Sequence, residues 1–122
     1  MFDHIGFAVA DVPASRAFYV AALAPLGISV AMEFGDQVGL GRGGRPQFWF
    51  GGGGKSPGHL HLAFAARNRE EVRAFHAAAL KAGAKDNGAP GLRSDYHPNY
   101  YGAFVIDLNG HNIEAVCHKP EA

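Results

Sequence analysis

The chain has 122 residues, enough for one domain with a buried core, and its 11 Lys and Arg residues balance its 11 Asp and Glu residues. This balance leaves no basic surface to attract nucleic acid or an anionic membrane, so we expect neither as a partner. The only cysteine, Cys117, cannot form an internal disulfide, and the opening residues do not resemble a secretion signal. No apolar run reaches the ~20 residues of a membrane helix. We therefore expect a soluble, cytoplasmic protein.

Two segments of the chain, residues 4–23 and 61–80, repeat each other without a gap, and the alignment places His4 on His61. Nine of the twenty aligned pairs are identical. The spacing exceeds the range of roughly 20–50 residues typical of solenoids, and only two copies are present. The repeat therefore indicates duplication of one supersecondary unit.

Each copy begins with a predicted strand, at residues 4–9 and 61–66. Alternation puts the large apolar side chains on one face, and His4 or His61 with small residues on the other. The bulky face should pack on the helix that follows. We therefore expect the two histidine faces to line a pocket.

Helices are predicted after the caps Asp11 and Asn68, ending at Pro25 and Gly83. Strands are expected after the first helix at residues 28–34, 37–41 and 47–50, and after the second at 101–107 and 111–117. Between the second helix and those last strands we expect an irregular segment, residues 87–98. The chain reads as a single α+β domain of two tandem βαβββ modules, residues 1–54 and 58–118, with a glycine-rich linker at 51–58.

A metal site needs a third ligand beside His4 and His61, and the last strand offers Glu114. A lone carboxylate between apolar residues is costly to bury unless something pairs with it. Two imidazoles and a carboxylate form a facial triad that leaves positions open for a substrate with two adjacent oxygens, and without a thiolate they favour Fe, Mn, Ni, Co or Zn as the divalent ion. His59 shares strand parity with His61 and stays an alternative ligand. An ion pair with Lys or Arg is the alternative role for Glu114.

Polar and aromatic residues crowd the segment before residue 102 and indicate a substrate rim. The candidates for acid or base work are His97, Tyr100 and Tyr101, and those for substrate binding are Arg93, Tyr96, Phe104 and Trp49. Phe104 shares a strand face with Tyr100, whereas Tyr101 lies on the other, and which face meets the pocket stays open. Trp49 is either a substrate platform or a core aromatic.

The paired modules and the motifs at residues 3–7, 61–64 and 107–114 resemble the vicinal oxygen chelate superfamily. That superfamily includes glyoxalase I, thiol transferases, extradiol dioxygenases and bleomycin-binding proteins. The resemblance implies metal ligands at His4, His61 and Glu114, a divalent transition metal, and a homodimer whose sites draw ligands from both chains.

Glyoxalase I-like members of this group carry a further carboxylate on the last strand of the first module. Aligning Gly43 with Gly110 puts Gln47 there, and a slip of one residue would put Phe48 there. Glutamine is a weak neutral ligand and no base, which disfavours a proton-shuttling isomerase. The resemblance implies a glyoxalase-like metalloenzyme, either a lyase or thiol transferase or an extradiol-type dioxygenase. The alternative is a non-catalytic, bleomycin-resistance-like protein that binds a small molecule or antibiotic.

Overall fold

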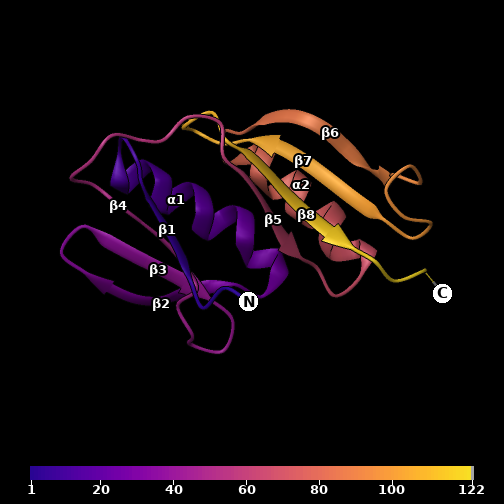
Figure 1. Cartoon of the computed structure of the whole chain (residues 1–122), viewed down its shortest axis with the longest axis horizontal. Helices are drawn as coiled ribbons and strands as arrows, with labels where there is room; N and C mark the ends of the chain where they lie inside the picture. The colour runs from indigo at the N-terminus through magenta and orange to yellow at the C-terminus, as the bar shows by residue number, and fades with distance from the viewer. Residues whose placement is uncertain (122) are drawn as a thin grey trace.

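The computed structural model describes residues 1–121 and shows two modules side by side, each with one sheet of four strands (Figure 1). Module one comprises β1 (Ile5–Ala8), α1 (Val12–Leu23), the 3-10 helix η1 (Ala24–Leu26), β2 (Ser29–Phe34), β3 (Gln37–Gly41) and β4 (Phe48–Gly51). Module two comprises β5 (His61–Ala65), α2 (Arg69–Lys81), β6 (Lys85–Leu92), β7 (Tyr101–Ile106) and β8 (Asn112–Cys117). The predicted fold class, α+β with two tandem βαβββ modules, is confirmed.

The two sheets have matching strand orders, β1-β4-β3-β2 and β5-β8-β7-β6. The first strand of each module pairs in parallel with the last and leaves its other edge free. Ile5 and Val9 donate backbone bonds to the β4 side, so the backbone groups of Gly6 and Ala8 point to the free edge of β1. By the same alternation, the backbone N–H and C=O groups of the odd-numbered residues of β5 point to the free edge of that strand.

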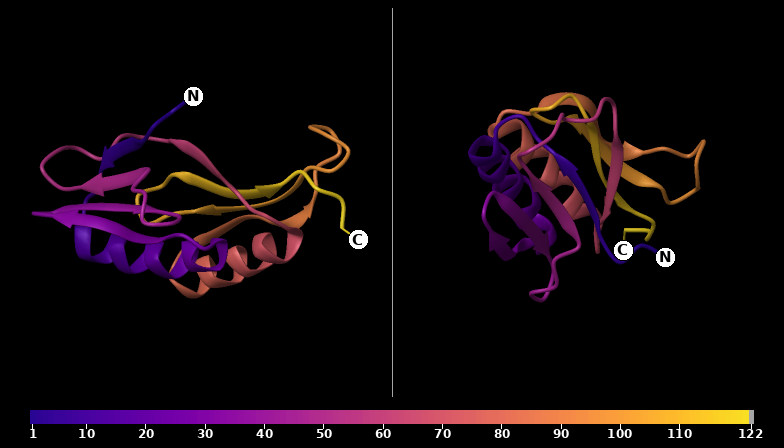
Figure 2. Two further views of the ribbon diagram at one scale, coloured as in Figure 1. Left: turned by 90° about the horizontal axis from the view of Figure 1, so that it is seen from below. Right: turned by 60° about the vertical axis from the view of Figure 1, so that its left-hand side comes forward.

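One hydrophobic core joins the two modules. Helices α1 and α2 pack against each other and lie on the same side of the molecule, beneath the sheets (Figure 2). Between the modules, the rings of Phe48 and Phe64 meet edge to face, with centroids 5.1 Å apart. The Tyr19 hydroxyl donates to Asp107 in the buried interior. Because each sheet turns one face to this core, its other face lies open to solvent.

Both predicted helix caps are confirmed. Asp11 Oδ1 accepts from the backbone N–H of Ala14 at 3.0 Å, and Asn68 Oδ1 accepts from that of Glu71 at 2.8 Å. These contacts satisfy amide groups that have no partner inside the helix. Within residues 1–121, neither helix has the length and apolar character needed to cross a membrane.

The prediction of an irregular segment at residues 87–98 is wrong over the first half of that range, which belongs to strand β6. Glycine, proline, aspartate and asparagine dominate this stretch, and all are depleted in strands. Strand β6 lies at the sheet edge, where Pro90 need not donate a ladder hydrogen bond. Its pairing with β7 shifts register on both sides of Gly88, whose φ of 155° favours glycine.

Candidate functional site

The open face of module two gathers a carboxylate, an imidazole and a phenol. Glu114 lies at the centre of β8, with Ala63 of β5 on one side and Phe104 of β7 on the other. His61 begins β5 on the same face, as the alternation predicted. These residues come from three adjacent strands, so the sheet holds them in place.

The Glu114 side chain is only 1% exposed, although it belongs to the open face. His61 Nε2 donates to Glu114 Oε1 at 2.8 Å, and the Tyr100 hydroxyl donates to Oε2. No Lys or Arg in residues 1–121 pairs with this carboxylate, so the alternative role predicted for Glu114 is not what the structure shows. A buried carboxylate without a strong cationic partner is costly, and within residues 1–121 the side chains that hydrogen-bond this one are an imidazole and a phenol.

Tyr100 reaches Glu114 across Gly102. A Cβ atom at position 102 would lie 3.2 Å from Tyr100 Cε1 and 3.4 Å from Glu114 Oε2. The absence of a side chain at Gly102 therefore gives the Tyr100 ring room to reach Glu114. Burial and the bond to the Glu114 carboxylate raise the pKa of Tyr100 to about 12. The hydroxyl therefore keeps its proton at neutral pH and acts as a donor.

Most of the predicted rim residues surround this cluster, and the exceptions are Tyr101 and Trp49, the latter in β4 of module one. The guanidinium of Arg93 lies 5.4 Å from the Phe104 ring centre, and the Tyr96 ring lies 5.1 Å from that of Tyr100. His97 packs its ring 5.6 Å from that of His118. Tyr101 takes the opposite face of β7, where its hydroxyl accepts from Arg73 of α2 at 3.3 Å, so the structure does not bring it to the site.

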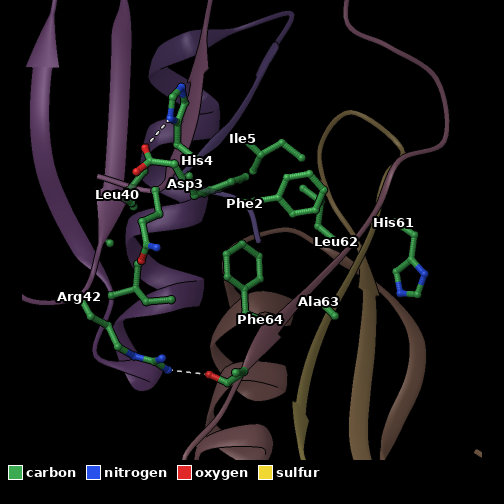
Figure 3. A pocket seen from close by; sticks show the side chains of 15 residues that line it. Phe2, Asp3, His4, Ile5, Leu40, Arg42, His61, Leu62, Ala63 and Phe64 are labelled. Atoms are coloured by element: carbon green, nitrogen blue, oxygen red, sulfur yellow. Dashed lines mark hydrogen bonds and ion pairs between the residues drawn. The ribbon is translucent and has the colours of Figure 1, made fainter. Parts of the chain in front are cut away.

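His4 lies apart from His61 and Glu114 within the chain. Figure 3 shows His4 and His61 on opposite sides of a pocket and pointing away from each other. His4 Nδ1 instead hydrogen-bonds Asp3 Oδ1 at 2.8 Å. No group of three His, Cys, Asp or Glu side chains in the described part of the chain could hold a metal ion. A single chain thus brings together two of the three predicted ligands.

The pocket between β1 and β5 has a volume of about 450 Å³. Its walls are mainly apolar and come from both modules, including Ile5, Phe48, Leu62 and Phe64. Arg42 at its edge donates to Ala65 O at 2.6 Å, on the free edge of β5. Phe2 also lines this pocket but is 76% exposed, so it does not close the pocket. The pocket is therefore open to solvent, with the unpaired edge of β1 on one side and that of β5 on the other.

A second cavity, of about 490 Å³, lies on the open face of module one beside His4. Trp49 lines it together with Met32 and Phe34, which are 49% and 63% exposed. Met32 and Phe34 were not among the predicted site residues. Their spacing of two residues within a predicted strand is the signal that could have found them.

The register of the sheets corrects the equivalence predicted for Gln47. Gly6 pairs with Trp49 in module one, and Ala63, its counterpart in the repeat, pairs with Glu114 in module two. Trp49 therefore occupies the position equivalent to Glu114. Gln47 lies two residues earlier, exposed in the loop before β4, where its backbone oxygen accepts from Ile5 at 2.9 Å.

The fold is that of the glyoxalase, bleomycin resistance and dioxygenase group. The chain is similar to a glyoxalase/bleomycin resistance protein from Albidiferax ferrireducens T118, with 29% identity, a TM-score of 0.85, and coverage of 96% of this chain and 98% of that one. It also resembles a glyoxalase/bleomycin resistance protein/dioxygenase family enzyme from Burkholderia phytofirmans PsJN, with 18% identity, a TM-score of 0.74, and coverage of 96% and 98%.

A third similar structure is the oxidase ChaP-H2, with 19% identity, a TM-score of 0.68, and coverage of 100% of this chain and 95% of that one. No protein-family model and no curated protein matches the chain. The chain has the paired βαβββ fold of the vicinal oxygen chelate superfamily, and the resemblance predicted from its sequence is confirmed.

Proposed function

We propose that this protein is a metalloenzyme of the vicinal oxygen chelate type whose site forms between two copies of the chain. Each site would take His61 and Glu114 from one chain and His4 of the partner subunit. The observation that carries this proposal is the Glu114 carboxylate, buried on an open sheet face with no Lys or Arg of residues 1–121 beside it. A divalent ion would supply the positive charge that this carboxylate lacks.

The free strand edges support the homodimer. His4 directly precedes β1 and His61 begins β5, and both strands leave one edge unpaired. The hollow between them is apolar, and Ile5 and Phe2 are exposed beside it. A second copy that laid its β1 along this β5 would cover the hollow and bring the two histidines to neighbouring strand positions.

Two imidazoles and one carboxylate, without a thiolate, suit Fe, Mn, Ni, Co or Zn. When bound, such an ion would act as a Lewis acid toward a small substrate with two adjacent oxygens. The site offers no second carboxylate, because Trp49 stands where one would lie and Gln47 is neutral. This favours a lyase, a thiol transferase or an extradiol-type dioxygenase over an isomerase that needs a carboxylate base.

The chain's own side chains would bind and orient the substrate. Arg93 is available for an anionic group, and Phe104 forms part of the same wall. His97 Nδ1 accepts from the backbone N–H of Asn99 at 3.1 Å, so its neutral ring carries the proton on Nε2. The Nε2–H group of His97 is therefore the one that we assign to donating a hydrogen bond to the substrate at the rim, while Tyr100 holds Glu114 in place.

Metal binding tests the proposal. Protein purified without chelator should hold close to one divalent ion per chain by elemental analysis, and His61→Ala or Glu114→Gln should weaken binding by about 100-fold or more in a calorimetric titration. His59→Ala is the matched control, because His59 lies in the linker outside β5, and it should bind metal as the wild type does. Metal content below a tenth of an equivalent in the wild type, unchanged in His61→Ala, would refute the metal site.

The alternative function is non-catalytic binding of a small apolar molecule. The two apolar-walled cavities favour it, as does the absence of a three-ligand group in residues 1–121. Such a protein would bind its ligand with equal affinity in the presence of a strong chelator. The metal titration above therefore separates the two functions.

A further inference from the structure

We propose that the substrate is a planar ring compound, aromatic or conjugated, whose ring stacks on Trp49 while its two adjacent oxygens meet the metal. This assignment rests on the proposed function and adds the chemical class of the substrate. The register of the two sheets supports it, because Trp49 in module one and Glu114 in module two occupy equivalent strand positions.

The indole of Trp49 lies across a glycine. A Cβ atom at position 39 would come within 2.8 Å of the ring, so any side chain there would displace it. Gly39 pairs with Trp49 as Phe104 pairs with Glu114, so the equivalent place in module two holds a phenyl ring. At this pair of strand positions each module thus places one large aromatic ring on its open face, contributed by β4 in module one and by β7 in module two.

The cavity beside Trp49 is suited to a flat apolar group. Phe34 stands against the indole with its ring centre 5.9 Å away and at an interplanar angle of 62°, forming a wall beside the indole. No Lys or Arg lines the cavity, and the nearby Arg45 is paired with Asp3 at 3.7 Å. A phosphorylated or polycarboxylate substrate would find no counter-charge here, whereas an aromatic ring would find a stacking partner.

His4 connects this cavity to the proposed metal. It lines the cavity together with Trp49, and it is the ligand that the partner subunit would contribute. A molecule held at the ion by two adjacent oxygens would extend its body along the same wall. On the Glu114 side of the proposed metal, the Phe104 ring with the Arg93 guanidinium 5.4 Å from its centre would lie near the same substrate.

Three hydroxamic acids test this assignment, because they present the same two adjacent oxygens on different bodies: methyl, cyclohexyl and phenyl. With the Zn(II)-loaded protein, calorimetry should give benzohydroxamic acid an affinity about tenfold higher than that of cyclohexanecarbohydroxamic acid, in line with the energy of an aromatic pair beyond its buried area. Acetohydroxamic acid should bind most weakly. Trp49 is the only tryptophan in the chain, so quenching of its fluorescence by the phenyl compound reports stacking directly.

Variants isolate the ring contact from the metal. Trp49→Leu should reduce the phenyl preference to within about twofold, and Trp49→Phe should retain most of it. Acetohydroxamic acid should bind both variants as it binds the wild type, which shows that the ion is still in place. Gly39→Ala, which displaces the indole without removing it, should also lower the phenyl preference, and Phe34→Leu gives an independent reading from the wall of the cavity.

The outcomes separate this assignment from the proposed function. If all three compounds bind the Zn(II) protein with similar affinity, or if the phenyl preference survives in folded Trp49→Leu, the ring assignment is wrong and the metal site stands. If none of the three binds, and no Zn(II) is retained, the metal site is wrong and the ring assignment falls with it.

Discussion

The two oxygens of Glu114 have different partners. Tyr100 donates to Oε2, and His61 donates to Oε1. A metal ion that displaced the His61 hydrogen bond would therefore meet Oε1, with Oε2 still held by the phenol. Outer hydrogen bonds of this kind orient a ligand and are worth a factor of about 10–100 in metal affinity.

Removal of the Tyr100 hydroxyl should weaken metal binding without unfolding the protein. We expect Tyr100→Phe to lower the affinity for Zn(II) by about tenfold in a calorimetric titration, because the carboxylate loses its fixed orientation. Tyr96→Phe is the matched control, since Tyr96 packs against Tyr100 but does not bond Glu114, and it should bind Zn(II) as the wild type does. Wild-type affinity in Tyr100→Phe would show that the phenol does not position the ligand.

Several of these residues could be predicted from the sequence because strand alternation assigns faces. It placed His61 with the small residues of its strand, and the repeat favoured His61 over His59, which lies just before β5 with a φ of 51°. Alternation could not show that His4 and His61 point apart, because it describes each strand alone and not the packing of two sheets. For the same reason it left the choice between Tyr100 and Tyr101 open.

At the scale of the elements, the helices and strands whose residues have the matching local preference were predicted well, whereas the edge strand β6 was not. Helix caps and periodic strands follow local chemistry, whereas β6 is a strand only because β7 supplies its partner. The mistaken alignment of Gln47 has a similar cause. The sequence repeat ends at residues 23 and 80, and the connections before β4 and β8 differ in length, so only the paired strands reveal the register.

Helix α2 depends at its start on Glu71. This carboxylate accepts from the backbone N–H of Arg67 at 2.8 Å and from Arg67 Nε at 2.7 Å. Burial alone would raise the pKa of Glu71, but these donors outweigh it and hold the pKa below 4.5. A carboxylate with a lowered pKa stabilises the fold at neutral pH, and this contribution is lost as the pH falls through its value in the folded protein.

We expect Glu71→Gln to lower the free energy of unfolding by about 1 kcal/mol at pH 7, measured by urea denaturation. The difference from wild type should shrink as the pH falls from the ordinary range of a glutamate through the lowered pKa of Glu71, because the carboxyl then becomes protonated in the folded state as well. Glu70→Gln is the control, because that side chain is 75% exposed and its ion pair with Arg73 is screened by solvent. A difference that did not change with pH would show that the Glu71 charge is not responsible.

At the scale of the whole molecule, the chain packs the core faces of its sheets together and leaves their other faces open. The proposed ligands are divided between those open faces. In the proposed site only a second copy would bring His4 to Glu114, which would make that site a property of the dimer.

Mixed dimers test this division. His4→Ala and Glu114→Gln should each fail to bind metal alone, because every site in either homodimer lacks one ligand. When the two variants are unfolded together and refolded in equal amounts, about half of the dimers should be mixed, and each mixed dimer has one complete site, so about a quarter of all sites should bind Zn(II). No recovery, from a mixture shown to contain mixed dimers, would place all three ligands in one chain.

Arg42 and Asp107 occupy equivalent positions just after β3 and β7, and both reach across to the other module. Arg42 donates to a carbonyl of β5, while Asp107 accepts from the Tyr19 hydroxyl of α1. A polypeptide made by repeating module one would bury a tyrosine hydroxyl with no acceptor, and one made by repeating module two would bury an aspartate with no phenol. The two copies of the repeat thus carry complementary side chains at equivalent positions, and each half supplies a contact that the other lacks.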